Sequence, residues 1–417
     1  MTSLENVTVP LAPLNAVSAS ASRTIPLIGA LLFCAMLPVT LLVAPLKELI
    51  GDRFSAGLFT THVFMSINML GAIALAPIIV ALSQHRRSRK AVAIVALAAD
   101  GILLATMGVV PSVTWVLALR FLEGAAHIIG ISGLMALAAA WAPPDRRGRA
   151  MGIAGAAMMF GTACGTRLGG ALWQHLPGWT FQIAGAINAL TAMFVLLFVE
   201  EAPATVAAAR SCLSDTLRLL KHHAALGVPF AYALMDRLCV GVVVSTFVLY
   251  LGDIQHLTAD QRSRLLMMFL MPFALLVYPA GRWVDRIGRV WPICLGSLAF
   301  GIIFATYGWW SAHDLHVVML LSGIVSAIMF APSLALTADL APADQRSLAF
   351  TGFNVAGSLG FLLGPILAGG LFSYCASFVS APEAYRLTFA ATGALQAACA
   401  LITLPMLLSL KSRGLVR

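Results

Sequence analysis

The sequence predicts an all-α membrane protein whose twelve transmembrane helices form two pseudo-symmetric six-helix bundles. Three observations predict this fold: an apolar composition, twelve apolar stretches of membrane-crossing length, and a repeat that relates the two halves. Of the 417 residues, 60% are hydrophobic and only 10% are charged, and the mean hydropathy is +0.92. A water-soluble domain of this length needs far more charge on its surface, so lipid must be the solvent for much of the chain.

Charged and turn-forming residues divide the chain into stretches of about 20 residues or more, the length that a helix needs to cross a bilayer. The predicted spans are 25–46, 56–82, 91–110, 115–140, 150–172, 179–199, 226–251, 265–284, 291–311, 315–338, 348–372 and 386–410. Residues 23–200 are predicted to form the first bundle and residues 225–410 the second, joined by a polar cytoplasmic linker over residues 201–224. A disordered tail is predicted over residues 1–22 and another tail over residues 411–417.

Basic residues are distributed unevenly between alternate loops. With the N-terminus inside, eighteen Lys and Arg residues fall on the cytoplasmic side and five on the opposite side. Because cytoplasmic loops carry an excess of basic residues, both termini are predicted to be cytoplasmic, in a multi-pass protein of the inner membrane. The net charge of +9 is then a topology signal, and no nucleic-acid partner is predicted.

The two halves share a register. The segment Ala142–Arg147 aligns with Ala341–Arg346 at an offset of 199 residues. The same offset relates Gly161 to Gly360, Gly165 to Gly364 and Gly170 to Gly369. Small residues let membrane helices approach closely. The residues predicted to lie at helix contacts are Gly161, Gly165, Gly169, Gly170, Gly360, Gly364 and Pro365.

A charged loop motif lies between the eighth and ninth spans. Residues 281–289 read G-R-W-V-D-R-I-G-R, with Asp285, Arg286, Gly288 and Arg289 at its centre. An acid beside basic groups can hold them in one conformation and release them in another, so this loop is a candidate gate. The equivalent first-half segment, residues 81–90, keeps the basic residues but has no acid.

Two more motifs lie in the fourth and fifth spans. The fourth span holds Arg120, followed four residues later by Gly124. The fifth span holds Gly152 and Gly161 nine residues apart, and then the segment G-T-A-C-G-T-R-L-G-G over residues 161–170. This segment has Thr166 where the motif that it resembles has proline.

With these motifs the chain resembles the major facilitator superfamily over nearly its whole length, and its fifth span is similar to that of drug/proton antiporters. The resemblance implies a secondary active transporter that moves a small solute by alternating access, with proton-coupled efflux favoured. It implies a small-molecule substrate and protons as partners, a lipid environment, a monomer and no cofactor. No catalytic residue is predicted, since no nucleotide loop, HExxH or GxSxG segment occurs, which disfavours an enzyme or a receptor.

A second transport function stays open at this point. Residues 38–40 read P-V-T where such exporters often carry an acid in the first helix. Together with the missing acid in residues 81–90, this keeps uptake of a nutrient, an organic ion or a metal-linked solute as the alternative.

Ionisable residues inside the spans are the candidate transport residues, because a charge within a bilayer is costly and is usually functional. Arg120, Glu123 and His127 lie on one helix face, and their repeat equivalents Met319, Ser322 and Ser326 carry no charge. A polar set present in one half only is a candidate for proton or substrate handling. A structural ion pair is the alternative.

The other interior charges have separate interpretations. Arg167 is expected near the depth of Arg120, so Glu123 could bridge both, as a site or as a structural salt bridge. Asp236 and Arg237 lie mid-span on a helix expected to line the path, and Asp236 is the second candidate for a protonatable group. Asp100 is interpreted as structural. No metal site is predicted, and the loop cluster His313-Asp314-x-His316 is taken as solvated.

Overall fold

The computed structural model describes residues 14–85, 89–142, 147–201, 213–342 and 345–414, and these ranges contain helices and no strand. The helices of the first half are α1 (Leu14–Leu41), α2 (Leu58–His85), α3 (Arg89–Met107), α4 (Val113–Trp141), α5 (Arg147–His175) and α6 (Thr180–Phe198). The helices of the second half are α8 (Gly227–Val242), α9 (Val248–Asp253), α10 (Ala259–Ile287), α11 (Val290–Ala305), α12 (Leu315–Leu340), α13 (Arg346–Cys375) and α14 (Ala381–Ser412). A π-helical turn over Val243–Phe247 joins α8 to α9, so these two helices make one span.

Eleven spans of the described residues are long and apolar enough to cross a membrane. The remaining long helix is α5, which has 29 residues and is rich in Gly and Ala. It packs between α1 and α10, so close contacts with protein take the place of a strongly apolar surface. The twelve-span, two-bundle fold predicted from the sequence is confirmed.

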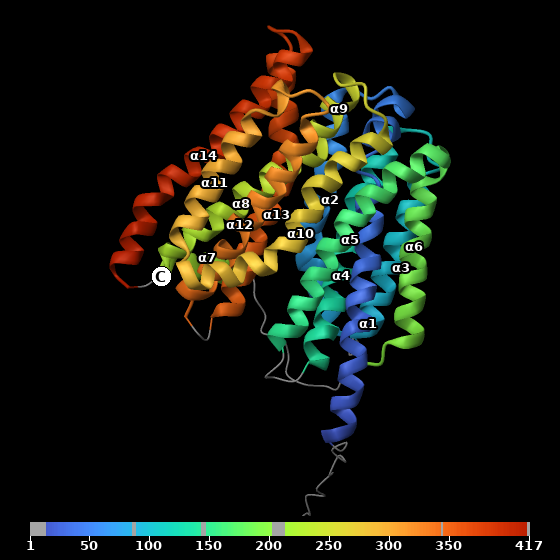
Figure 1. Ribbon diagram of the computed structural model, residues 1–417. Helices are drawn as coiled ribbons and strands as arrows, with labels where there is room; N and C mark the ends of the chain where they lie inside the picture. The colour runs from blue at the N-terminus through green and yellow to red at the C-terminus, as the bar shows by residue number, and fades with distance from the viewer. Residues whose placement is uncertain (1–13, 86–88, 143–146, 202–212, 343–344, 415–417) are drawn as a thin grey trace, which may run out of the picture.

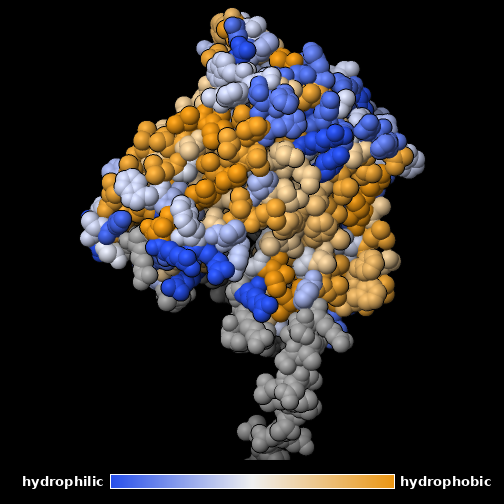
Figure 2. All heavy atoms as spheres, in the orientation of Figure 1, coloured by the Kyte–Doolittle hydropathy of each residue, from blue (hydrophilic) through white to orange (hydrophobic). Residues whose placement is uncertain are grey.

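The bundles stand side by side, as Figure 1 shows, with the start of α1 and the end of α14 on the same, lower side. Figure 2 shows apolar side chains across the middle of the visible face and hydrophilic patches toward its ends. This is the distribution expected of a surface that meets lipid at mid-height and water at both ends.

Two boundaries differ from the sequence predictions. Residues 14–22, expected in a disordered tail, are helical and extend α1 beyond the membrane span. Part of the predicted linker is also helical, as α7 (Leu213–His222). There Leu219 is buried against the second bundle while Arg218 and Lys221 are exposed, so an amphipathic pattern that is too short to span has formed a surface helix. Residues 1–13 and 202–212 lie outside the described residues.

Glycines bring the same pair of helices together in each half. A Cβ atom on Gly161 would lie 2.6 Å from the carbonyl oxygen of Phe33, and one on Gly165 would lie 2.8 Å from that of Leu37, both on α1. In the second half, Gly360 and Gly364 press in the same way on the backbone of α8, and the Pro365 ring packs on Gly241 of that helix. The repeat is therefore an α1–α5 contact in one bundle and an α8–α13 contact in the other.

Candidate functional site

Four ionisable side chains meet inside the first bundle. A nitrogen of the Arg120 guanidinium lies 2.9 Å from a carboxylate oxygen of Glu123, one helical turn away on α4. On the same helix, the Nδ1 atom of His127 lies 3.0 Å from a carboxylate oxygen of Asp100 on α3. We call these four residues the charge cluster. It includes Asp100, which the sequence had left as a separate structural residue.

The charge cluster is sealed from solvent. Asp100, Arg120 and Glu123 are fully buried and His127 is 5% exposed. Even so, one oxygen of Asp100 and one of Glu123 have no polar partner among the described residues, and the other Glu123 oxygen meets only the Arg120 guanidinium. Buried polar atoms without partners are rare and costly. The charge cluster therefore has unused hydrogen-bonding capacity.

Close helix packing encloses the charge cluster. Gly124 on α4 presses on the backbone of Asn68 on α2, and Gly71 on α2 presses on that of Phe121. The Arg120 guanidinium lies over the Phe64 ring of α2, with its carbon 4.9 Å from the ring centroid. The three polar side chains of α4 therefore face the bundle interior between α2 and α3.

The charge cluster also offers a set of metal-ligand atoms that the sequence did not predict. One ligand atom each from Asp100, Glu123 and His127 lies within 4.8 Å of the other two. Two carboxylates and an imidazole can hold a cation, but the Arg120 guanidinium already occupies one side of Glu123. A bound proton is the smaller change to this arrangement, since it adds charge without displacing Arg120.

The prediction that Glu123 bridges Arg120 and Arg167 is wrong. Arg167, on α5, lies 2.7 Å from a carboxylate oxygen of Asp260 on α10 in the other bundle, and it also donates to the Ser263 hydroxyl at 3.2 Å. From its position in the fifth span, Arg167 was expected at about the same depth in the membrane as Arg120. The rotation of α5 instead directs its side chain across the interface between the bundles. The Asp260 carboxylate binds Arg264 as well.

Arg167 is part of a wider contact between the bundles, which we call the latch. Lys47 pairs with Asp253 at 2.7 Å, and Glu48 pairs with the fully buried Arg262. The Nε2 atom of His62 lies 2.9 Å from the hydroxyl of Thr246. Among the residues that the structure describes, the hydrogen bonds and ion pairs joining the two bundles all lie at this end, opposite the start of α1.

Asp236 and Arg237 lie in the middle of the α8–α9 span. The Nε atom of Arg237 is 3.7 Å from a carboxylate oxygen of Asp236, too long for a hydrogen bond. The Asp236 side chain is 11% exposed and that of Arg237 is 27% exposed. This pair is far from the charge cluster in the chain and belongs to the other bundle.

The loop motif ties three helices of the second bundle together. Arg289 donates to Asp285 at 3.1 Å and pairs with Asp339 at the end of α12, a residue that the sequence analysis did not single out. Gly288 ends α10 with a φ of 91°, which favours glycine. Arg286 is exposed. The side chains of residues 81–88, in the equivalent first-half segment, lie outside the described residues.

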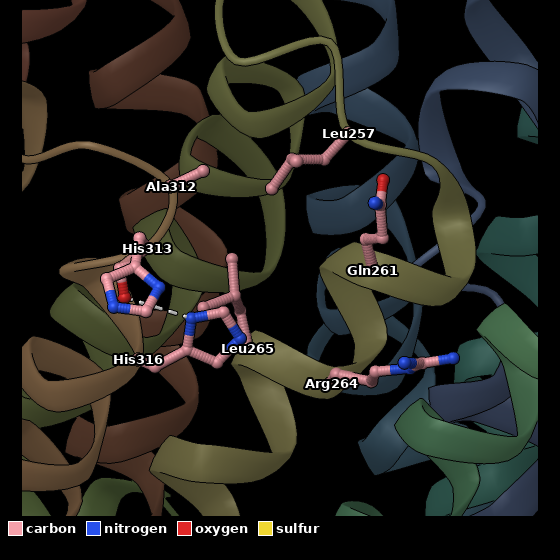
Figure 3. A pocket seen from close by; sticks show the side chains of 7 residues that line it. All are labelled: Leu257, Gln261, Arg264, Leu265, Ala312, His313 and His316. Atoms are coloured by element: carbon pink, nitrogen blue, oxygen red, sulfur yellow. Dashed lines mark hydrogen bonds between the residues drawn. The ribbon is translucent and has the colours of Figure 1, made fainter.

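A pocket of about 300 Å³ opens at the latch end of the second bundle, between the start of α10 and the loop before α12. Figure 3 shows His313 and His316 side by side in it, with Arg264 at the opposite wall. Both histidines are exposed, and His316 bonds only to the backbone of His313 through Nδ1. The pocket lies apart from the charge cluster.

Two helical bundles, joined at one end and holding interior charges, define the architecture of a solute transporter. The sequence matches the Major Facilitator Superfamily over residues 28–235 and 229–414, so the chain belongs to this family of membrane transporters. The fold of a bacterial homolog to the human lysosomal transporter Spinster, in an inward-facing and unoccupied conformation, superimposes with a TM-score of 0.78 at 16% identity, over 95% of this chain and 99% of that one. At this level of identity, the structural similarity establishes the fold of the chain.

Two curated relatives are multidrug resistance proteins by name, and one of these names is that of an efflux pump. The chain is 30% identical over 131 residues to Multidrug resistance protein 2 of Bacillus subtilis, which is 31% of this chain and 32% of that protein. It is 24% identical over 284 residues to the Multi-drug resistance efflux pump PmrA homolog of Lactococcus lactis, which is 63% of this chain and 66% of that protein. The matched region is less than two thirds of either relative.

Proposed function

We propose that this chain exports a small amphipathic compound in exchange for protons, by alternating access across the inner membrane. The observation that carries the proposal is the charge cluster, in which one oxygen of Asp100 and one of Glu123 are buried without a polar partner among the described residues. The name of the Lactococcus lactis relative, an efflux pump, supports the direction of transport. The basic loops support a cytoplasmic location for the end opposite the latch.

A count of charges connects the cluster to protons. Two ionised carboxylates and one guanidinium leave one negative charge when the His127 imidazole is neutral, and none when it is protonated. Because an uncompensated charge is costly in a dry interior, gain or loss of this one proton changes the free energy of the sealed cluster. A conformational change that opens a path to the cluster from one side of the membrane would let the proton exchange there.

The latch supplies the second part of alternating access. Its ion pairs hold the bundles together at the end predicted to face outward, so the described conformation is closed outward. Rocking of the bundles about the α5–α10 and α2–α13 contacts would break these pairs and open the outer side. The free energy that is lost when the latch ion pairs break then has to be offset by stronger binding of substrate and protons to the outward-open state.

The test is antiport in liposomes that contain the purified protein and the pH indicator pyranine. Vesicles are loaded with neutral, cationic or anionic aromatic compounds and diluted, so that exit of a compound drives proton entry and acidifies the interior. We expect acidification with wild type and none with Glu123→Gln. Ser322→Ala is the matched control, since Ser322 is the repeat equivalent of Glu123.

Three outcomes would reject the proposal. They are compound exit without a pH change, full coupling in Glu123→Gln, and exit that depends on Na⁺ in place of protons. Uptake is distinguished by orientation: right-side-out membrane vesicles energised by respiration would accumulate the compound if the chain is a permease, whereas inverted vesicles would do so if it is an exporter.

A further inference from the structure

Arg237 has an unusual environment for a charge in the middle of a membrane span. Its guanidinium carbon lies 5.4 Å from the ring centroid of Phe330 on α12 and 5.6 Å from that of Phe361 on α13. A Cβ atom on Gly357 of α13 would lie 3.2 Å from the Cγ atom of Arg237, so the bare glycine backbone leaves room for the arginine stem. Two aromatic rings and a glycine thus hold the guanidinium in place.

Arg237 makes an ion pair with Asp236 but no hydrogen bond within the part of the chain that the structure describes. A guanidinium has five N–H donors, and Arg237 donates none of them to another residue that the structure describes. Its nearest acid, Asp236, is 3.7 Å away. Adjacent positions on a helix point about 100° apart, so the two side chains cannot align in a bidentate pair without distortion.

The energetic cost of a charge in lipid argues that the exposed part of Arg237 is turned away from lipid. The side chain is 27% exposed near the centre of the span, and lipid contact at that depth would cost several kcal/mol. The side chain also lies between α12 and α13 on the protein side of α8. The remaining direction is toward the first bundle, which the ion pairs of the latch hold to the second bundle at the outer end.

Aromatic rings continue away from the guanidinium. Phe330 packs edge-on against Phe273 of α10, with ring centroids 5.6 Å apart, and against Phe353 of α13 at 6.3 Å. Phe273 in turn stacks on Phe269. The second bundle thus presents rings from three helices near a cation whose ion pair with Asp236 is long, at 3.7 Å.

We infer that Arg237, Phe330 and Phe361 form a substrate subsite for an aromatic compound that carries a carboxylate or a similar anionic group. The anion binds the guanidinium through two parallel N–H···O bonds, and the ring of the compound packs against the two phenylalanines. The subsite rests on the proposed transport function, for which it names the substrate class. The Asp236 carboxylate, 3.7 Å from the guanidinium, competes with the substrate anion for it.

The test is binding of three matched probes to the full-length protein in lipid nanodiscs, measured by calorimetry: 1-naphthoate, the neutral 1-naphthalenemethanol and the cationic 1-naphthylmethylammonium. We expect 1-naphthoate to bind most tightly. Arg237→Gln should weaken it at least tenfold and leave the neutral probe within about twofold, since a charge-assisted bond is lost. The affinity of Arg237→Lys for 1-naphthoate should lie between those of wild type and Arg237→Gln, because an ammonium keeps the positive charge but cannot donate two parallel hydrogen bonds. Phe361→Leu should weaken all three probes.

Unchanged binding of 1-naphthoate to Arg237→Gln, or tightest binding of the cationic probe with its loss in Asp236→Asn, would overturn the subsite. If Arg237→Gln does not fold, as judged by its melting without probe, the Arg237→Lys comparison decides in its place. Binding is read without a proton gradient. The binding experiment can therefore support the subsite even if the liposome assay finds full coupling in Glu123→Gln. It can also reject the subsite even if the liposome assay finds proton exchange.

Discussion

Gly170 and Gly369 hold equivalent positions in the two halves, and each presses on a helix of the opposite bundle. Gly170 on α5 abuts the backbone of Ala259 and the side chain of Ser263 on α10. Gly369 on α13 abuts the ring of His62 on α2, where a Cβ atom would lie 2.7 Å from Cγ. A single repeated glycine thus sets the approach of the bundles at both of their seams.

Gly170→Ala should therefore open the latch. The added methyl group collides with the Ala259 carbonyl, which is backbone and cannot rotate away, so the closed population should fall about tenfold or more. Spin labels at Trp179 and Trp310, both exposed, would report the separation of the bundles in a variant without the seven native cysteines. Gly155→Ala is the matched control on the same helix, because a Cβ atom there meets nothing within 4 Å. Equal distances in the two variants would contradict this role.

The Glu48–Arg262 pair should stabilise the latch as a pair. Glu48→Arg and Arg262→Glu each place like charges together, with one of them buried, and should each cost the closed state about 2 kcal/mol or more. The double swap restores opposite charges and should recover most of the closed population, as the same spin-label distances would show. Additive losses in the double variant would mean that the two residues act separately.

Arg120→Met should destabilise the folded protein by about 3–5 kcal/mol, because it leaves the Glu123 carboxylate buried without its counter-charge. The double variant Arg120→Met/Glu123→Met removes both charges, and its stability should return to within about 1–2 kcal/mol of wild type. Reversible unfolding in mixed micelles measures both. The count of charges with Asp100 and His127 is the same in the double variant as in wild type, so loss of proton exchange in a folded double variant would show that the Arg120–Glu123 pair itself serves transport. Normal antiport in that variant would make the pair structural only.

The loop motif should act through Arg289 and not through its neighbour. Arg289→Gln breaks contacts with Asp285 and Asp339 that join α10, α11 and α12, and should lower the transport rate severalfold. Arg286→Gln removes an exposed charge of the same type three residues away and should stay within about twofold of wild type. Initial rates in the liposome assay compare them. Equal losses of transport rate in the two variants would mean that the total positive charge of the loop matters and not the specific contacts of Arg289.

Much of the fold could be predicted from the sequence because it depends on quantities that are local in the chain. Charged and turn-forming residues delimited all twelve spans, among them α5, whose small residues keep it out of the eleven strongly apolar helices. The glycines at the offset of 199 residues also have equivalent packing partners in the structure. The helical start of α1 and the helix α7 were missed, since neither contributes to a membrane span.

The candidate residues were less predictable than the fold. The i, i+3 and i+7 spacing placed Arg120, Glu123 and His127 together, because these three lie on one helix. It could not assign Asp100 to His127 or Arg167 to Asp260, because each pair joins two helices. Asp260 and Asp339 lie close to helix ends, where a charge is ordinary, so nothing in their sequence positions distinguished them.

The sequence by itself determined that the chain is a duplicated bundle of membrane helices, with interior charges that lipid would not tolerate unpaired. Composition and spacing suffice for that conclusion, since the bilayer imposes span length and polarity on every segment. Only the tertiary structure decided which charge meets which: His127 with Asp100 inside one bundle, Arg167 with Asp260 across the latch, and Arg237 with aromatic rings and no hydrogen-bonding partner among the described residues. Those pairings depend on the rotation and depth of each helix against its neighbours, and close packing between distant segments sets both.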